Sequence, residues 1–258
     1  MKLGMPILYE FSTIEENFKL AQELGLDFVE LNLNFDYCRK ALEDGTIKEL
    51  LKKYKLETTL HFFDEADFAS YQEVVDGYMS LLNKYVSLGE GFINMVNVHN
   101  NPGPVSTISG IKHFIYEKEY SEFIARLLAN LNKAKALCNE KGARFVIENT
   151  DIAPTATYMA KVMEDEFEAG FRFNYDIGHD NVCGYLVRDL LRTLPLEFDE
   201  FHFHDGDGKK CHLSLGEGTM NEKLEEFKAL AEANEAYVLL EVKSKEDLIK
   251  TVGAFKAL

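Results

Sequence analysis

Short apolar runs alternate with longer amphipathic stretches along the whole chain. The apolar runs are rich in Phe, Val, Ile and Leu, which is typical of strands that are buried on both faces of a parallel sheet. They lie at residues 3–8, 28–32, 57–62, 92–99, 144–149, 171–176, 200–204 and 237–241. Eight such strands in strict alternation with eight helices predict an α/β fold, a (β/α)8 TIM barrel.

The amphipathic stretches carry helix start and stop signals. The stretch TIEENFKLAQELG ends at Gly25, and a longer one over residues 120–142 also ends at a glycine, as helices often do. The last stretch begins at Ser244, a favourable N-cap, with two acidic residues in its first turn. No linker rich in Pro, Ser or Gly interrupts the pattern, so residues 1–258 are expected to form one domain.

The longest loop is predicted after His99, over the sequence NNPGPVSTISG. It is rich in Gly and Pro, which are typical of irregular backbone. Because it follows the carboxyl end of a strand, it is expected on the active-site face, where it would act as a lid.

Charge and cysteine content limit the classes of binding partner and the cellular compartment that are expected. The chain has 44 acidic and 28 basic side chains and a formal net charge of −16. Because phosphate binding relies on Lys and Arg, this balance argues against nucleic acid and anionic membrane as partners. The four cysteines are widely spaced without a CxxC pair, which is typical of reduced thiols. No apolar run is long enough for a signal peptide or a membrane span, so a cytoplasmic protein is expected.

Six of the apolar runs end on a side chain that can bind a metal. These ends carry His61, His99, Glu148, Asp176 with His179, His202 with His204, and Glu241. A closed parallel barrel brings such ends together at one face. Three carboxylates there would repel one another and raise each other's pKa values, and a divalent cation would relieve this. Mixed imidazole and carboxylate donors suit Zn or Mn better than Ca, so the pattern predicts a metalloenzyme.

Structural explanations exist for each of these residues alone. A single histidine at a strand end is more often hydrogen-bonded than ligating, Glu148 has Arg144 on its own strand as a partner, and Asp176 with His179 is compatible with a loop cap. Together these explanations require six independent coincidences. The metal site is therefore the favoured interpretation.

The segment that follows His202 contains further candidates. His202 and His204 share one face of a strand, so one of them is expected to face the barrel mouth. Asp205 and Asp207 are interpreted as solvated turn residues. The Gly216-Glu217-Gly218 sequence precedes a helix and would either hold an oxyanion or form a plain tight turn.

The sequences IENT, NYDIGH, HFHD followed by HLSLGEG, and LLE resemble the xylose-isomerase-like barrel superfamily over nearly the whole chain. This superfamily holds sugar isomerases and epimerases together with endonuclease IV. The resemblance to ketose 3-epimerases implies that Glu148, Asp176, His202 and Glu241 bind one divalent metal. It further implies that Glu148 and Glu241 act as acid and base and that His179 contacts the sugar. His61, Lys210 and His212 are the other expected substrate-binding residues.

The endonuclease IV branch implies a different metal count. Its trinuclear zinc site uses histidines that match His61, His99, His179 and His212. Lys210 stands where that branch has an aspartate ligand, and an ammonium group cannot bind a cation. A third zinc is therefore not expected, whereas a second ion at His61 and His99, bridged by Glu148, remains open beside the single-ion alternative.

These observations favour a metal-dependent isomerase or epimerase of carbohydrate metabolism that acts on a small-molecule sugar or sugar phosphate. The alternative is an endonuclease IV-like phosphodiesterase that acts on abasic DNA, against which the net charge and Lys210 both argue. A barrel that binds a metal or ligand without catalysis ranks last, because both candidate acid/base glutamates are present. Relatives in this superfamily often pair, which leaves a homo-oligomer open.

Overall fold

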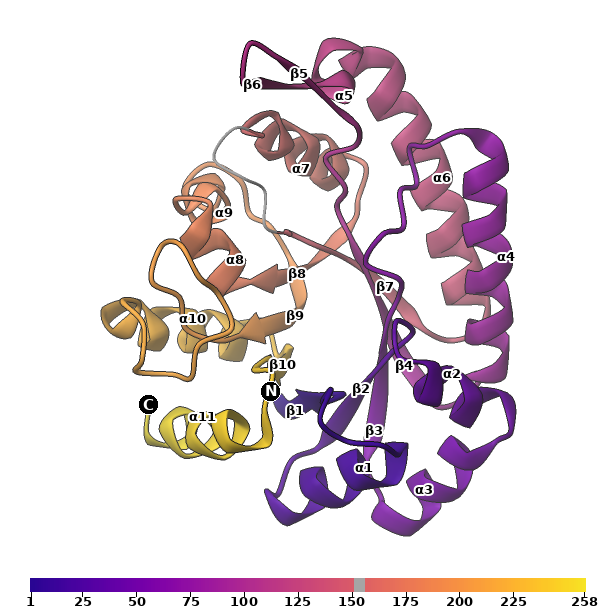
Figure 1. Cartoon of the computed structure of the whole chain (residues 1–258), viewed down its shortest axis with the longest axis vertical. Helices are drawn as coiled ribbons and strands as arrows, with labels where there is room; N and C mark the ends of the chain where they lie inside the picture. Colours follow the sequence, from indigo (N-terminus) through magenta and orange to yellow (C-terminus); the bar gives the residue numbers. More distant parts are fainter. Residues whose placement is uncertain (151–155) are drawn as a thin grey trace.

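A computed structural model describes residues 1–150 and 156–258. Eight parallel strands form a closed barrel in the order β1-β10-β9-β8-β7-β4-β3-β2 (Figure 1). This confirms the predicted (β/α)8 TIM barrel. The barrel strands are β1 (Lys2–Pro6), β2 (Phe28–Asn32), β3 (Glu57–His61), β4 (Ile93–His99), β7 (Arg144–Glu148), β8 (Arg172–Asp176), β9 (Phe198–Phe203) and β10 (Tyr237–Leu240).

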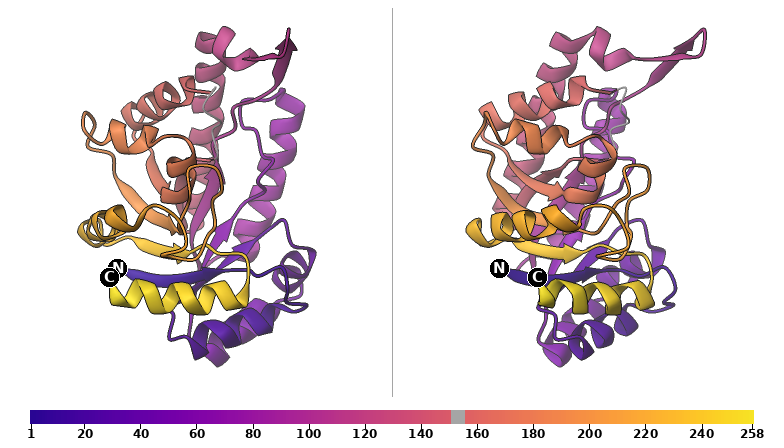
Figure 2. Two further views of the ribbon diagram at one scale, coloured as in Figure 1. Left: turned by 60° about the vertical axis from the view of Figure 1, so that its left-hand side comes forward. Right: turned by 90° about the vertical axis from the view of Figure 1, so that its left-hand side faces the viewer.

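Helices surround the barrel, and in several places more than one helix joins consecutive strands (Figures 1 and 2). The strict one-to-one alternation predicted from the sequence is therefore wrong in detail. The helices are α1 (Ile14–Glu23), α2 (Asp36–Glu43), α3 (Thr46–Tyr54), α4 (Gln72–Leu88), α5 (Ile115–Lys118), α6 (Tyr120–Glu140), α7 (Tyr158–Glu168), α8 (Ile177–Val182), α9 (Leu186–Leu190), α10 (Asn221–Ala233) and α11 (Lys245–Ala257). Among the described residues, no helix is both long and apolar enough to cross a membrane.

The helix ends follow the predicted signals. Helix α1 is followed by Gly25 with a φ of +66°, a conformation that glycine adopts without a steric penalty. Before α11, the Ser244 side chain accepts a hydrogen bond from the backbone N–H of Asp247.

The predicted loop after β4 contains a second, two-stranded antiparallel sheet. Its strands are β5 (Val105–Ile108) and β6 (Ile111–Phe114), and most of their residues are exposed. Figure 2 shows this hairpin projecting away from the barrel. The expectation of irregular backbone throughout this segment is therefore wrong, and a lid role stays a prediction.

Alternate residues of the strands fill the barrel in layers, as the period of two requires. The layer near the amino ends is apolar and consists of Phe28, Met95, Val146, Tyr237 and Leu239. Two positions further along several strands lies a buried polar layer that contains Glu30, Thr59, Asn97, Asn174 and Glu200. The next inward positions of β3, β4, β8 and β9 carry His61, His99, Asp176 and His202, whereas Glu148 and Glu241 stand two positions after Val146 and Leu239 of the apolar layer. The barrel thus presents a polar floor beneath these donors.

Candidate metal centre

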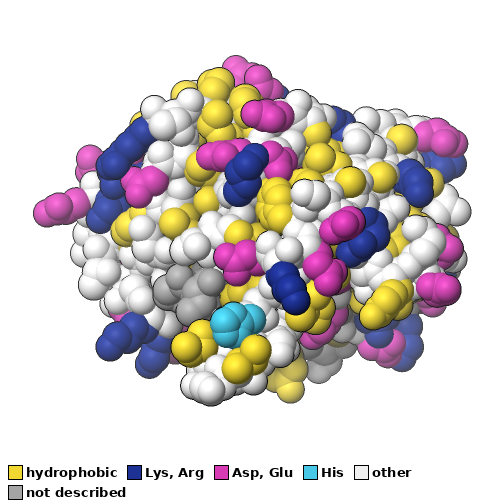
Figure 3. Space-filling view, turned by 90° about the horizontal axis from the view of Figure 1, so that it is seen from above, with side chains coloured by type: hydrophobic (Ala, Val, Ile, Leu, Met, Phe, Trp, Pro, Cys, Tyr) yellow, Lys and Arg dark blue, Asp and Glu magenta, His cyan; other side chains and the backbone are white. Residues whose placement is uncertain are grey.

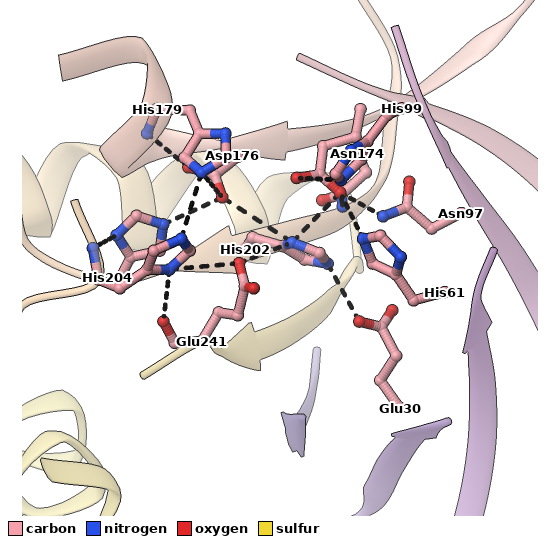
Figure 4. Close-up of polar contacts among 12 residues, drawn as sticks. Glu30, His61, Asn97, His99, Asn174, Asp176, His179, His202, His204 and Glu241 are labelled. Carbon is pink, nitrogen blue, oxygen red and sulfur yellow. Dashed lines mark hydrogen bonds and ion pairs between the residues drawn. The ribbon is translucent and has the colours of Figure 1, made fainter. Parts of the chain in front are cut away.

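Four side chains converge at the carboxyl ends of four strands, and Figure 4 labels three of them, Asp176, His202 and Glu241. Glu148 ends β7, Asp176 ends β8, His202 lies in β9, and Glu241 directly follows β10. One donor atom from each lies within 4.8 Å of the other three. This is the set that the sequence analysis assigns to a single divalent cation.

His202 lies at the centre of this set and is fully buried. Its Nδ1 is 3.1 Å from Glu241 Oε2, 3.3 Å from Glu148 Oε2 and 3.8 Å from Asp176 Oδ2. Neither ring nitrogen of His202, nor Glu241 Oε2, makes a hydrogen bond within the described part of the chain. Buried polar atoms normally have partners. A divalent cation between these donors fits the set, because mixed imidazole and carboxylate ligands are typical of Zn and similar metals.

A second donor group shares Glu148. His61 Nε2 lies 3.5 Å from Glu148 Oε2, and His99 Nε2 lies 3.6 Å from Glu148 Oε1. His61 Nδ1 is 2.8 Å from the carbonyl oxygen of Phe62, to which only a protonated Nδ1 can donate. When the ring is neutral, the lone pair of His61 therefore belongs to Nε2, which faces Glu148. The predicted second pair, His61 and His99, does come together.

A third group lies beside Asp176. The Nε2 atoms of His179 and His212 are 3.3 Å apart, and His212 Nδ1 is 3.1 Å from the carbonyl oxygen of Glu241. Asp176 Oδ1 also accepts a hydrogen bond of 2.6 Å from the backbone N–H of His179, which makes it the N-cap of α8. The loop-capping explanation of Asp176 is thus correct, and it coexists with the cluster.

The ionisation of the carboxyl groups differs from the expectation of raised pKa values. Burial raises the pKa of Glu148, Asp176 and Glu241, but adjacent imidazoles outweigh it and lower the pKa of all three. For Glu241 the largest opposing contribution comes from Lys243. Glu241 still repels Asp176 and raises its pKa, but the imidazoles between the carboxylates outweigh this, so the expected net rise in pKa is wrong here.

The lysine at the cluster is not the one that the sequence analysis named. Lys210 lies in an exposed turn, where its backbone N–H donates to Asp207. Lys243 Nζ instead lies 2.6 Å from Glu241 Oε1. Its position two residues after a strand-end glutamate is the signal that could have identified it. Arg144 pairs with Asp199 at 3.2 Å, so the structure does not make it the partner of Glu148.

Asp205 organises the loop that follows β9. It is fully buried, and its carboxylate accepts hydrogen bonds from four backbone N–H groups, those of Gly206, Gly216, Gly218 and Met220. The interpretation of Asp205 as a solvated turn residue is wrong. Of the two alternatives left open at the glycine turn, the structure supports the tight turn and not the oxyanion site, because the chain's own carboxylate already occupies those donors.

The sequence analysis also missed the polar floor. Asn97 and Asn174 both donate to Glu148 Oε2, the latter at 3.1 Å, and Glu30 Oε1 lies 3.6 Å from His202 Nε2 (Figure 4). A signal was available: Asn97 and Asn174 stand two positions before strand-end donors and hence on the same face. These residues orient the donors from below.

Comparison with known proteins agrees with this architecture. The family model described as xylose isomerase-like TIM barrel matches residues 18–257. A D-tagatose 3-epimerase-like protein superposes with a TM-score of 0.79 at 20% identity, covering 100% of this chain and 96% of its own.

Two further solved structures superpose over the whole chain. A D-allulose 3-epimerase from Methylomonas sp. in complex with D-allulose gives a TM-score of 0.70 at 16% identity, with 100% and 96% coverage. The IOLI protein with a bound zinc atom gives 0.73 at 13% identity, with 100% and 96% coverage. At the level of sequence, no curated protein matches significantly. The chain belongs to the xylose isomerase-like TIM barrel family.

Proposed function

We propose that this protein is a metal-dependent isomerase or epimerase of a small sugar or sugar phosphate. The observation that carries the proposal is the meeting of two glutamates, Glu148 and Glu241, with Asp176 and His202 within 4.8 Å. β7 and β10, which lead to the two glutamates, are separated in the barrel by β8 and β9. The two carboxylates therefore approach a bound substrate from different walls, as transfer of a proton between two faces of one carbon requires.

Two observations support the acid/base role of Glu148 and Glu241: the lowered pKa values of their carboxyl groups and the side chains that hold them in place. The pKa values of Glu148 and Glu241 are held well below the usual value, burial notwithstanding, so both are bases at neutral pH. Asn97 and Asn174 hold Glu148 in place from below, and Lys243 holds Glu241. A divalent cation, when bound, would supply an electrophile for the substrate oxygens beside the carbon that loses its proton.

His179 is the candidate contact to the substrate. Burial lowers its pKa, but Asp176 together with the other carboxylates raises it overall. His61 and His212 are the remaining candidates on either side of the four-donor set. Lys210 lies in an exposed turn, so it would have to move toward the cluster on substrate binding to contact the substrate.

Zn or Mn is the proposed metal, with one ion at the four-donor set and, in the two-ion alternative, a second at His61, His99 and Glu148. The donor chemistry supports this choice. The zinc atom in the IOLI protein, a structural neighbour, is consistent with it. A sugar partner is likewise consistent with the D-allulose complex of another neighbour.

The proposal is tested by hydrogen exchange. Ketoses and ketose phosphates are incubated with the metal-loaded protein in D2O, and deuterium at the carbon next to the carbonyl is measured by NMR. E148Q and E241Q should slow exchange by about 100-fold or more. E166Q is the matched control, since Glu166 is equally buried but outside the cluster, and burial raises its pKa to about 8. Undiminished exchange in both cluster variants would contradict the acid/base assignment.

A phosphodiesterase of the endonuclease IV type is the second candidate. The donor groups around His61 with His99 and around His179 with His212 favour it, because phosphodiester cleavage commonly uses several metals. The net charge of −16 opposes it. On the face seen in Figure 3, acidic and basic side chains are intermixed, without the basic stripe that DNA binding favours. Incision of an abasic duplex by the metal-loaded protein would decide for this candidate.

A further inference from the structure

The geometry points to His204 as a positioning residue that fixes the Asp176 carboxylate through a single imidazole tautomer. This inference rests on the proposed function only in so far as Asp176 binds a metal. His204 is fully buried and lies two residues beyond His202, outside the four-donor set. Its Nε2 is 3.0 Å from Asp176 Oδ2 (Figure 4).

The tautomer follows from a backbone contact. The N–H of His212 lies 2.8 Å from His204 Nδ1, and a backbone N–H can only donate. His204 Nδ1 therefore carries a lone pair, and a proton there would face the amide hydrogen. The carbonyl oxygen of Asp205 is also near Nδ1, but at 3.3 Å it is the more distant contact. The ring proton accordingly resides on Nε2, which donates to Asp176.

This tautomer makes His204 unsuited to binding the cation itself. Its Nδ1 lone pair is engaged by the backbone, and its Nε2 bears the hydrogen that Asp176 accepts. With Oδ1 held by the N–H of His179 and Oδ2 by His204, the Asp176 carboxylate cannot rotate. Outer partners of this kind orient metal ligands and raise metal affinity.

Two local features hold the imidazole ring in place. A Cβ atom on Gly178 would lie 2.0 Å from His204 Cε1, so only glycine allows the ring to pack against α8. His212 has a φ of +59°, a conformation uncommon for residues other than glycine. This conformation accompanies the alignment of its N–H with His204 Nδ1. Strain retained at such a position is typical of sites where geometry matters.

Two substitutions separate the hydrogen bond from His204 Nε2 to Asp176 from the one that His204 Nδ1 accepts from the N–H of His212. Gln places its amide nitrogen near the position of Nε2, so H204Q retains a donor for Asp176. Asn places its amide oxygen near the position of Nδ1, so H204N retains an acceptor for His212 but loses the donor to Asp176. H113N is the matched control, because His113 is exposed on β6.

The first readout needs no metal. In metal-free protein labelled with ¹⁵N-histidine, long-range ¹H–¹⁵N correlation should show His204 with an unprotonated Nδ1 and a protonated Nε2, assigned by loss of the signals in H204Q. A protonated Nδ1 overturns the inference. Because this measurement is independent of cation binding, it tests the tautomer of His204 separately from the proposed function.

The second readout is the affinity for Zn²⁺ or Mn²⁺ at the four-donor set, measured by competition with a chelator. H204N should weaken binding by about 10- to 100-fold, and H204Q should recover most of that loss. Equal losses in the two variants would indicate packing alone and overturn the inference, as would unchanged affinity in H204N. A wild-type protein that binds neither metal contradicts the proposed function, whereas the NMR result still decides the His204–Asp176 hydrogen bond.

Discussion

Glu30 of β2 and His202 of β9 meet inside the barrel, where Glu30 Oε1 lies 3.6 Å from His202 Nε2 while Nδ1 faces the three carboxylates. Burial lowers the pKa of His202, but the surrounding carboxylates, Glu30 among them, raise it well above its usual value. A carboxylate behind a ligating histidine fixes its orientation and increases its basicity. Glu30 therefore supports the His202 ring of the candidate metal centre from behind.

The substitution E30Q should weaken metal binding by about 10-fold, because it removes the charge that faces His202. The measurement is metal affinity by competition with a chelator. E200Q is the control, because burial, followed by the proximity of Glu30, raises the pKa of the Glu200 carboxyl group well above its usual value and so favours the neutral form that Gln resembles. Equal effects of the two substitutions would refute the charge argument.

Metal binding at the second donor group should strengthen with pH. Burial lowers the pKa of His61, but Glu148 and Glu30 raise it to about 10, so the metal-free ring is protonated at neutral pH. A cation must displace that proton from Nε2, and affinity should therefore rise as pH approaches 10 and fall in acid. Calorimetry in two buffers of different ionisation enthalpy measures the proton released, and H61N should release about one proton fewer. A pH-independent affinity would contradict this.

Removing the charge of Asp205 should disorder the loop between β9 and α10. D205N leaves one acceptor oxygen for four backbone donors, a cost on the order of 3 kcal/mol in a buried site. Hydrogen exchange at the amides of Gly216, Gly218 and Met220 should accelerate accordingly. D207N, in the exposed part of the same loop, should leave these amides protected.

The substitution G178A should displace His204 and weaken metal binding, because the added methyl group would overlap the imidazole ring. Affinity for Zn²⁺ and the thermal unfolding temperature are the two measurements. G253A is the control: Gly253 also lies in a helix, α11, but nothing lies within 4 Å of its Cβ position. Alanine there should be neutral or stabilise by roughly 0.5 kcal/mol. Wild-type metal affinity in G178A would show that the ring accommodates the methyl group.

The barrel and its donors were predictable because both follow from short-range periodicity. Apolar runs that stop at Glu148, Asp176 and Glu241 imply strand ends, and closure of the sheet brings strand ends together. The β5–β6 hairpin was not predicted, because nearly all of its residues are exposed and the sequence therefore lacks the alternation of apolar and polar positions that marks a half-buried strand.

Residues whose roles depend on contacts between distant segments were harder to predict. From the sequence, Asp205 is interpreted as a turn residue, because most of its hydrogen bonds come from the backbone of residues 216–220, more than ten positions further along the chain. The pKa values of the carboxyl groups likewise depend on which histidines lie between them. His204 and His202 are equivalent by strand alternation, and their roles differ only through contacts with distant segments, among them the amide of His212 at His204 Nδ1.

The pairing of β1 with β10 joins the first strand of the chain to the last. Glu241 follows β10, so the fourth donor leaves the ribosome only after all the other barrel strands have been made. A nascent chain therefore cannot close its sheet before it carries the full donor set. Closure of the barrel and completion of the four-donor set then coincide, so loading of the proposed ion at this set would follow synthesis of the barrel.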